Sequence, residues 1–165
     1  MKRFACVTLT ICLLLSGCGI FSERMLEPVT FYYLQSEYQF GQDSSVIVSE
    51  QREASGHRQD LSYLLALYLM GPSEEEHVTS LPAGTRIIKL HQINDEIRME
   101  LTETNHVMSD LEFTLACACL SQTCLGMTDA KTITITYRGS TVSMTAESLM
   151  LFDDSASGAS TEETQ

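Results

Sequence analysis

Alternation of hydrophobic and polar positions predicts several β-strands along this chain. Residues 30–34 and 45–51 are rich in aromatic and β-branched side chains and predict the first two strands. In residues 96–102 every second side chain is hydrophobic, and those between them are charged or polar. This pattern predicts a strand with one face against a core and the other face in water.

Further strands are predicted where β-forming runs are bounded by turn residues. These runs are residues 85–91, 132–137 and 141–144. The sequence Arg-Gly-Ser at residues 138–140 predicts a turn between the last two runs. Residues 149–152 are again hydrophobic and are a candidate continuation of the last strand.

Between residues 57 and 71 the hydrophobic period lengthens from two to about 3.6 residues, which predicts an amphipathic helix. The hydrophobic stripe consists of Leu61, Leu64, Leu65, Tyr68 and Leu69. Gly71 and Pro72 should end this helix, because glycine accepts a left-handed cap and proline cannot continue the helix.

A second helix is predicted over residues 110–122. Ser109 and Glu112 have the spacing of a capping box, in which each side chain bonds to the backbone N–H of the other residue. One face of the helix carries Leu111, Leu115 and Ala118.

The predicted order, with two strands before each helix and two after the second, indicates the α+β class. We expect two helices packed on one face of a mostly antiparallel sheet, with the other face open. Residues 29–152 are long enough for one domain with one core and too short for two.

The N-terminal segment has the pattern of an export signal. Lys2 and Arg3 precede a hydrophobic run at residues 4–15, which is too short to span a bilayer and predicts a cleaved signal peptide over residues 1–17. The run ends in Leu-Ser-Gly-Cys, which resembles the lipobox of bacterial lipoproteins. We therefore expect Cys18 to carry lipid, residues 18–28 to form a tether, and the protein to lie at the extracytoplasmic face of the cell membrane.

The charge balance bears on the class of partner. Removal of residues 1–17 takes away two basic residues and leaves 8 basic and 22 acidic residues, a net charge of −14. Such a field repels phosphate groups, so nucleic acid is excluded as a partner. Residues 153–165 are acidic and rich in Ser and Thr without a large hydrophobic side chain, which predicts a disordered tail.

Several short motifs resemble one known family. They are Tyr68-Leu69-Met70-Gly71-Pro72, Ser80-Leu81-Pro82-Ala83-Gly84-Thr85-Arg86 and Met99-Glu100-Leu101-Thr102. Together they are similar to the GerMN domain family of sporulation and spore-germination lipoproteins, over residues 31–151. The resemblance implies a spore-forming Gram-positive source, a domain like the ring-building folds of envelope machines, and no catalytic residues. The positions expected to matter for the fold are Gly71, Pro72, Leu81, Pro82 and Gly84.

Three cysteines leave several interpretations open. Cys117 and Cys119 lie about 200° apart on a helix, so they cannot share a metal ion unless the helix breaks. Buried free thiols are favoured; a disulfide between Cys119 and Cys124 requires the helix to end near Ser121. The histidines are scattered at positions 57, 77, 91 and 106, so neither a metal site nor a cofactor is expected.

Two functional classes follow from these observations. The first is a non-catalytic interaction module that assembles with envelope or sporulation proteins, or with further copies of itself, through the open sheet face and an edge strand. The alternative is a ligand-binding lipoprotein that holds a cell-wall fragment or small molecule outside the membrane. An enzyme is disfavoured, because neither a nucleophile motif nor a phosphate-binding loop is present in the sequence.

Overall fold

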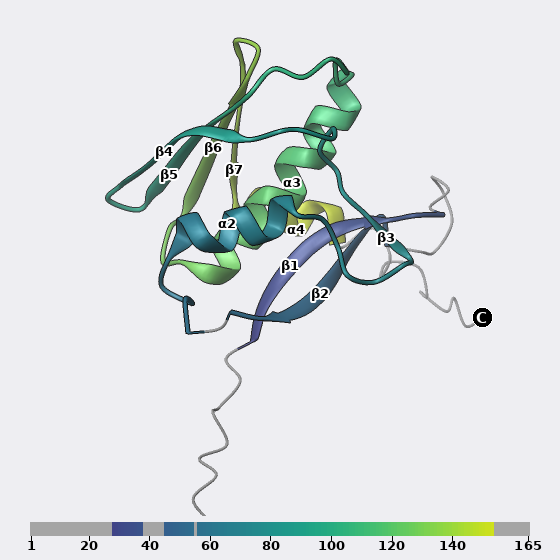
Figure 1. Cartoon of the computed structure of the whole chain (residues 1–165). Helices are drawn as coiled ribbons and strands as arrows, with labels where there is room; N and C mark the ends of the chain where they lie inside the picture. Colours follow the sequence, from purple (N-terminus) through teal and green to yellow (C-terminus); the bar gives the residue numbers. More distant parts are fainter. Residues whose placement is uncertain (1–27, 38–44, 55, 154–165) are drawn as a thin grey trace, which may run out of the picture.

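The computed structural model describes residues 28–37, 45–54 and 56–153 and shows two sheets with a long helix between them (Figure 1). The smaller sheet has the order β2-β1-β3 and is antiparallel throughout. Its strands are β1 (Pro28–Gln35), β2 (Ile47–Glu53) and β3 (His77–Val78). Two of these strands, β1 and β2, come from the N-terminal part of the domain and are paired over most of their length.

The larger sheet has the order β4-β5-β6-β7. Its strands are β4 (Ile87–Ile93), β5 (Glu96–Leu101), β6 (Thr132–Tyr137) and β7 (Ser140–Thr145). The β5–β6 pair is parallel, because helix α3 (Asp110–Met127) connects these two strands, and the other two pairs are antiparallel. Helices α2 (Leu61–Leu69) and α4 (Ala146–Asp153) complete the described fold.

Helix α3 lies between the sheets and contacts β1 on one side and β6, β7 and α4 on the other (Figure 1). Residues 116–121 are all buried, so this part of the helix has no solvent-facing side. Alanine, cysteine and serine are frequent there because neighbouring backbones approach the helix from several directions. The hydroxyl of Thr123 also accepts a hydrogen bond at 3.0 Å from the backbone N–H of Tyr32, which covers the edge of β1.

One face of the larger sheet packs on the core and the other is open. Ile97, Met99 and Leu101 on β5 are buried, and the charged residues between them are partly or fully exposed. In β6, Ile133 and Ile135 are buried and the threonines between them are half-buried. The α+β class and the one wet side of β5 are therefore confirmed.

The structure differs from the prediction in how the strands and helices are arranged. The strands form two sheets rather than one, and α3 lies between them rather than beside α2 on a shared face. Helix α3 continues to Met127, beyond the predicted end at residue 122. Many of its buried residues are small and do not form a hydrophobic stripe, so the sequence pattern did not indicate where the helix ends. Helix α2 begins later than predicted, at Leu61, where the Asp60 side chain accepts a hydrogen bond from the backbone N–H of Tyr63.

Residues 149–152 do not continue β7, because α4 begins at Ala146. The hydroxyl of Ser148 accepts from the backbone N–H of Thr145 at 2.9 Å, and the hydroxyl of Thr145 accepts from the N–H of Ser148 at 3.3 Å. These reciprocal bonds satisfy two backbone donors at the start of a helix in the manner of a capping box. They turn the chain from strand to helix before the hydrophobic run begins.

Candidate functional site: an open sheet face and a buried polar network

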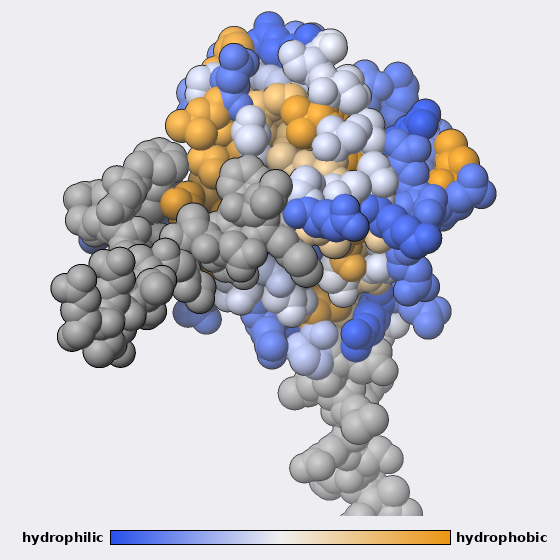
Figure 2. All heavy atoms as spheres, turned by 180° about the vertical axis from the view of Figure 1, so that it is seen from behind, coloured by the Kyte–Doolittle hydropathy of each residue, from blue (hydrophilic) through white to orange (hydrophobic). Residues whose placement is uncertain are grey.

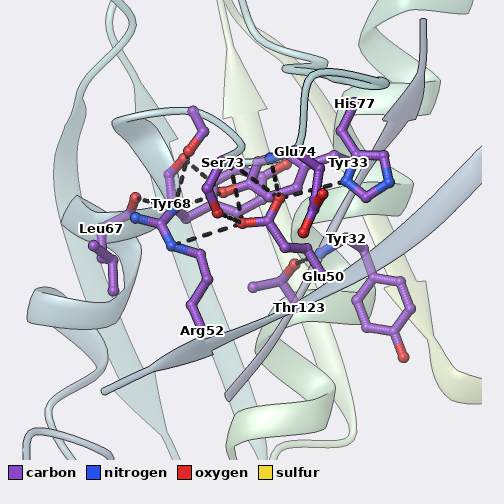
Figure 3. A network of polar contacts seen from close by, with 11 residues as sticks. Tyr32, Tyr33, Glu50, Arg52, Leu67, Tyr68, Ser73, Glu74, His77 and Thr123 are labelled. Atoms are coloured by element: carbon purple, nitrogen blue, oxygen red, sulfur yellow. Dashed lines mark hydrogen bonds and ion pairs between the residues drawn. The ribbon is translucent and has the colours of Figure 1, made fainter. Parts of the chain in front are cut away.

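The end of α2 is built around Gly71, which has a φ of +91°. Its backbone N–H donates to the carbonyl of Tyr68 at 3.0 Å, as in a common helix-ending motif. That motif would take a second N–H from the next residue, and Pro72 has none. The guanidinium of Arg52 on β2 supplies donors instead, at 3.4 Å from the carbonyl oxygen of Leu67 and 2.9 Å from that of Gly71 (Figure 3).

Glu50 lies beside Arg52 and is only 4% exposed. Its carboxylate accepts from the backbone N–H groups of Ser73 at 3.1 Å and Glu74 at 3.2 Å, and also from the Ser73 hydroxyl (Figure 3). His77 Nδ1 lies 3.4 Å from one carboxylate oxygen, and Arg52 Nε lies 3.7 Å from the other. These contacts fasten the loop after α2 to the middle of β2.

Burial and hydrogen bonding act on the pKa of Glu50 in opposite directions. Burial alone would raise the pKa, but the hydrogen bonds from Ser73, Glu74 and His77 outweigh it and hold the pKa below its ordinary value. The carboxylate is therefore ionised at neutral pH, and its acceptor positions are occupied by donors of the protein itself. Its burial and these donors place the carboxylate to hold the loop after α2 against β2.

Two stacked tyrosines extend this network into the core. The rings of Tyr33 and Tyr68 are 4.9 Å apart and nearly parallel, and the Tyr33 hydroxyl donates to the carbonyl of Tyr68 at 3.2 Å. Burial raises the pKa of Tyr33 to about 12. The Arg52 guanidinium carbon lies 5.5 Å from the centre of the Phe31 ring. One arginine thus contacts an aromatic face, a carboxylate and the end of a helix.

Leu81, Pro82 and Gly84 form a tight turn that leads into β4. Leu81 is 4% exposed and belongs to the core. The carbonyl of Pro82 accepts from the backbone N–H of Thr85 at 3.1 Å and from its hydroxyl at 2.7 Å. Gly84 has a φ of +84°, which the third position of a type II turn requires. These residues therefore set the backbone conformation of the turn that leads into β4.

The open face of the larger sheet is lined by short polar and charged side chains. The Thr134 hydroxyl donates to Glu96 Oε1 at 2.8 Å and lies 2.9 Å from the Ser143 hydroxyl. Glu96 also forms an ion pair with Arg98 at 2.8 Å. Further pairs on this face are Lys89 with Glu100 and Thr136 with Thr141. The face thus presents donors and acceptors in rows across four strands.

The outer edges of this sheet differ. In β4 the pairing register shifts between Ile87 and Lys89, which is the sign of a bulge, and Ile88 is 55% exposed. In β7 the residues from Ser140 to Thr145 pair with β6 without a shift, and none of them is charged. A bulge and a lysine protect an edge against further pairing, so β7 is the less protected edge.

The exposed large hydrophobic side chains of the described residues are spread over several elements, namely Met70, Val78, Ile88, Ile93, Val107 and Leu111. On the face seen from behind in Figure 2, a group of hydrophobic residues lies at the upper left, and the right is mostly hydrophilic with a small hydrophobic spot. Val107 is 60% exposed and Leu111, at the start of α3, is 51% exposed.

The structure decides between the interpretations of Cys119 and Cys124. Both lie inside α3, five positions apart, with no helix end near Ser121, and both thiols are free and buried. They are separated by about 7.5 Å along the helix axis and point in different directions, so the disulfide alternative is wrong. Burial raises the pKa of Cys117, Cys119 and Cys124 to about 12 in each case.

Histidines pair with carboxylates more often than their spacing suggested. Besides His77 with Glu50, His106 lies 3.3 Å from Glu112 on the surface. Within the described ranges, no group of three or more His, Cys, Asp or Glu side chains is arranged to hold a metal ion. No helix of these residues is long and hydrophobic enough to cross a membrane. Cys18 lies outside the described residues.

Sequence reasoning missed Glu50 and Arg52, although both were visible in the pattern of β2. They occupy alternate positions with Val48 and therefore share the inward face of the strand. An acid and a base two residues apart on an inward face are a signal for a buried ion pair. The sequence could not reveal their partners, which come from residues 67–77.

Comparison with known proteins gives a likeness of fold. The chain matches no protein-family model and no curated protein. Among solved structures it is similar to the tandem GerMN domains of the sporulation protein GerM from Bacillus subtilis, with a TM-score of 0.47 and 16% identity over 68% of this chain. It is also similar to a candidate lipoprotein from Clostridium perfringens, with a TM-score of 0.46 and 14% identity over 74% of this chain.

The α+β class of the domain rests on the helices and the two sheets described above. The chain spans 39% of the length of the GerM structure and 91% of that of the Clostridium perfringens protein.

Proposed function

We propose that this protein is a non-catalytic, lipid-anchored component of the bacterial cell envelope, which assembles with other proteins during sporulation or spore germination. The lipobox at residues 15–18 supports the anchor. The GerMN-like motifs and fold support the setting. The role of GerM in sporulation belongs to that protein and is extended to this chain only as part of this proposal.

The observation that carries the proposal is the open face of the β4–β7 sheet. A four-stranded sheet with one face on the core has its other face turned outward, and the described residues of that face are exposed or half-buried. Threonine and serine hydroxyls on β6 and β7 both donate and accept, and they lose little side-chain entropy on binding. Such a surface suits a protein partner that lies flat against the sheet.

The chemistry of the buried groups favours a role without catalysis. The most deeply buried carboxylate, Glu50, is occupied by donors from its own chain. The thiols of Cys117, Cys119 and Cys124 are protonated at neutral pH because burial raises their pKa to about 12. None of these groups is both reactive and accessible to a substrate.

Fractionation of cells that express a Cys18→Ala variant tests the anchor. Wild-type protein should be found in the membrane fraction as a processed, lipid-modified form, because acyl chains anchor it stably. The variant should lose the lipid and leave that fraction or accumulate as the precursor. If the variant stays membrane-bound, and unprocessed wild type is the main form, the lipoprotein assignment is wrong.

Site-specific photo-cross-linking in sporulating cells of the source organism tests the assembly role. A photoreactive amino acid replaces Arg98 on the open sheet face or, as the control, Glu75 in the exposed loop after α2. Defined adducts with envelope proteins, or with a second copy of the chain, are expected at position 98 and not at position 75. Equal adducts at both positions, or none at position 98, would contradict the use of the open face.

A further inference from the structure

A groove of about 530 Å³ lies between the start of α2 and the inner side of β4. Its residues are Gly56, His57, Gln59, Asp60, Leu61, Ser62, Leu90 and Gln92. Leu90 and Gln92 are two positions apart on β4 and therefore point to the same side of the sheet. A volume of this size lies within the range of small-ligand sites in proteins.

The polar side chains that line the groove are available for a ligand. Within the described part of the chain, Gln59, Ser62 and Gln92 are exposed or partly exposed, and their side chains make no hydrogen bond to another described residue. Each glutamine amide offers two donors and an acceptor in one plane. Only one oxygen of Asp60 is used, at 3.0 Å from the backbone N–H of Tyr63.

The groove also has flat and apolar surfaces. The imidazole of His57 stacks on the Tyr63 ring, with the ring centres 4.3 Å apart and the planes inclined by 28°. Leu61 and Leu90 are half-buried and also line the groove. Polar groups that converge on a partly apolar surface fix the orientation of a ligand.

The lining excludes several chemical classes. It contains no lysine or arginine, and the charge of the chain is strongly negative, so an anionic ligand would be repelled. It contains one carboxylate, which is too few to hold a divalent cation without other ligands. A wholly apolar ligand would gain no hydrogen bond from the amides, the hydroxyl and the imidazole, which are exposed and bind water in the free protein.

We propose that this groove binds a short neutral saccharide that carries acetamido groups. Sugar hydroxyls donate and accept at adjacent positions, which matches the paired donor and acceptor atoms of Gln59 and Gln92. The methyl of an acetamido group fits against Leu61 or Leu90, and its amide matches Ser62 or Asp60. This inference concerns a different surface from the open sheet face and does not depend on the assembly role.

Binding of N,N′-diacetylchitobiose to the purified full chain in detergent micelles tests the proposal. Titration calorimetry or saturation-transfer NMR should show saturable binding by the wild type. Gln92→Ala should weaken binding by about tenfold, equivalent to about 1.4 kcal/mol, because one residue provides two ligand hydrogen bonds. Gln51→Ala, an exposed glutamine on β2 outside the groove, is the matched control and should bind like the wild type.

The competing outcomes are distinct. Absence of saturable binding by wild-type protein that is folded, as shown by a cooperative urea-unfolding transition, would overturn the proposal. An equal loss in Gln92→Ala and Gln51→Ala would place the binding elsewhere on the chain. Equal affinity for maltose, which lacks acetamido groups, would overturn the assignment of the acetamido class. None of these results alters the cross-linking expected at position 98.

Discussion

The guanidinium of Arg52 donates a hydrogen bond to the carbonyl oxygen of Leu67, 3.4 Å away, at the C-terminal end of α2. The residue that would ordinarily supply an N–H at this point is Pro72, which has none. A side chain from β2 therefore completes the end of a helix that is distant in sequence. Its positive charge also lies at the end of the helix where the backbone dipole favours a cation.

Replacement of Arg52 by methionine should lower the free energy of unfolding by about 2–4 kcal/mol. The change leaves the carbonyl of Gly71 without its donor, leaves the carbonyl of Leu67 with only the Met70 N–H, and removes the ion pair of the buried Glu50. Urea unfolding followed by circular dichroism measures the loss. Arg58→Met is the control, because Arg58 is exposed, and a loss as large in that variant would contradict the role assigned to Arg52.

The lowered pKa of Glu50 predicts how stability changes in acid. Because the folded pKa lies below the ordinary value of 4.5, the carboxylate contributes stability that is present above that pH and is lost as the pH falls through the folded pKa. Glu50→Gln, which cannot ionise, should be about 1–3 kcal/mol less stable than the wild type at pH 7. The difference between the two proteins should narrow as urea unfolding is repeated at decreasing pH below 4.5. A difference that stays constant with pH would show that ionised Glu50 does not stabilise the fold.

Local sequence signals predicted the elements that depend on neighbouring residues. The capping box of Ser109 and Glu112 is present: the N–H of Glu112 donates to the Ser109 hydroxyl at 3.3 Å, and the N–H of Ser109 donates to the Glu112 carboxylate at 2.7 Å. The alternation along β5 also gave the correct core face. These features arise within a few residues, so their spacing in the sequence is sufficient.

Features that depend on distant residues were missed. The burial of Glu50 is stabilised by Ser73 and His77, more than twenty positions away, and no local pattern encodes that meeting. The division into two sheets depends on where α3 packs, and its Ala-Cys-Ala-Cys sequence has no stripe that would indicate the direction of its contacts. Tertiary packing, rather than helix or strand propensity, decided these cases.

Gly71→Ala should destabilise the protein, and Gly126→Ala should stabilise it. A Cβ at either position meets no atom within 4 Å, so crowding does not separate them. Gly71 has a φ of +91°, which should cost an alanine about 1–2 kcal/mol. Gly126 lies inside α3 without a positive φ, where alanine is favoured by about 0.5–1 kcal/mol. Thermal unfolding measures whether each variant is more or less stable than the wild type. A loss of stability of the same size in both would refute the backbone explanation for Gly71.

The cysteines of α3 should be unreactive in the folded protein. Each side chain of Cys117, Cys119 and Cys124 is buried, and burial raises each pKa to about 12, so the reactive thiolate is scarce at pH 8. Alkylation by iodoacetamide should be at least about a hundredfold slower in buffer than in concentrated urea, where exposure restores the ordinary pKa.

Mass spectrometry of the urea-treated protein, without a reductant, then distinguishes free thiols from a disulfide. Alkylation at all three positions is expected, because α3 holds Cys119 and Cys124 too far apart along its axis to bond. Alkylation at Cys117 alone, with the other two positions reacting only after reduction, would mean that the helix breaks near Ser121. Under the proposed lipid anchor, Cys18 should resist alkylation under every condition.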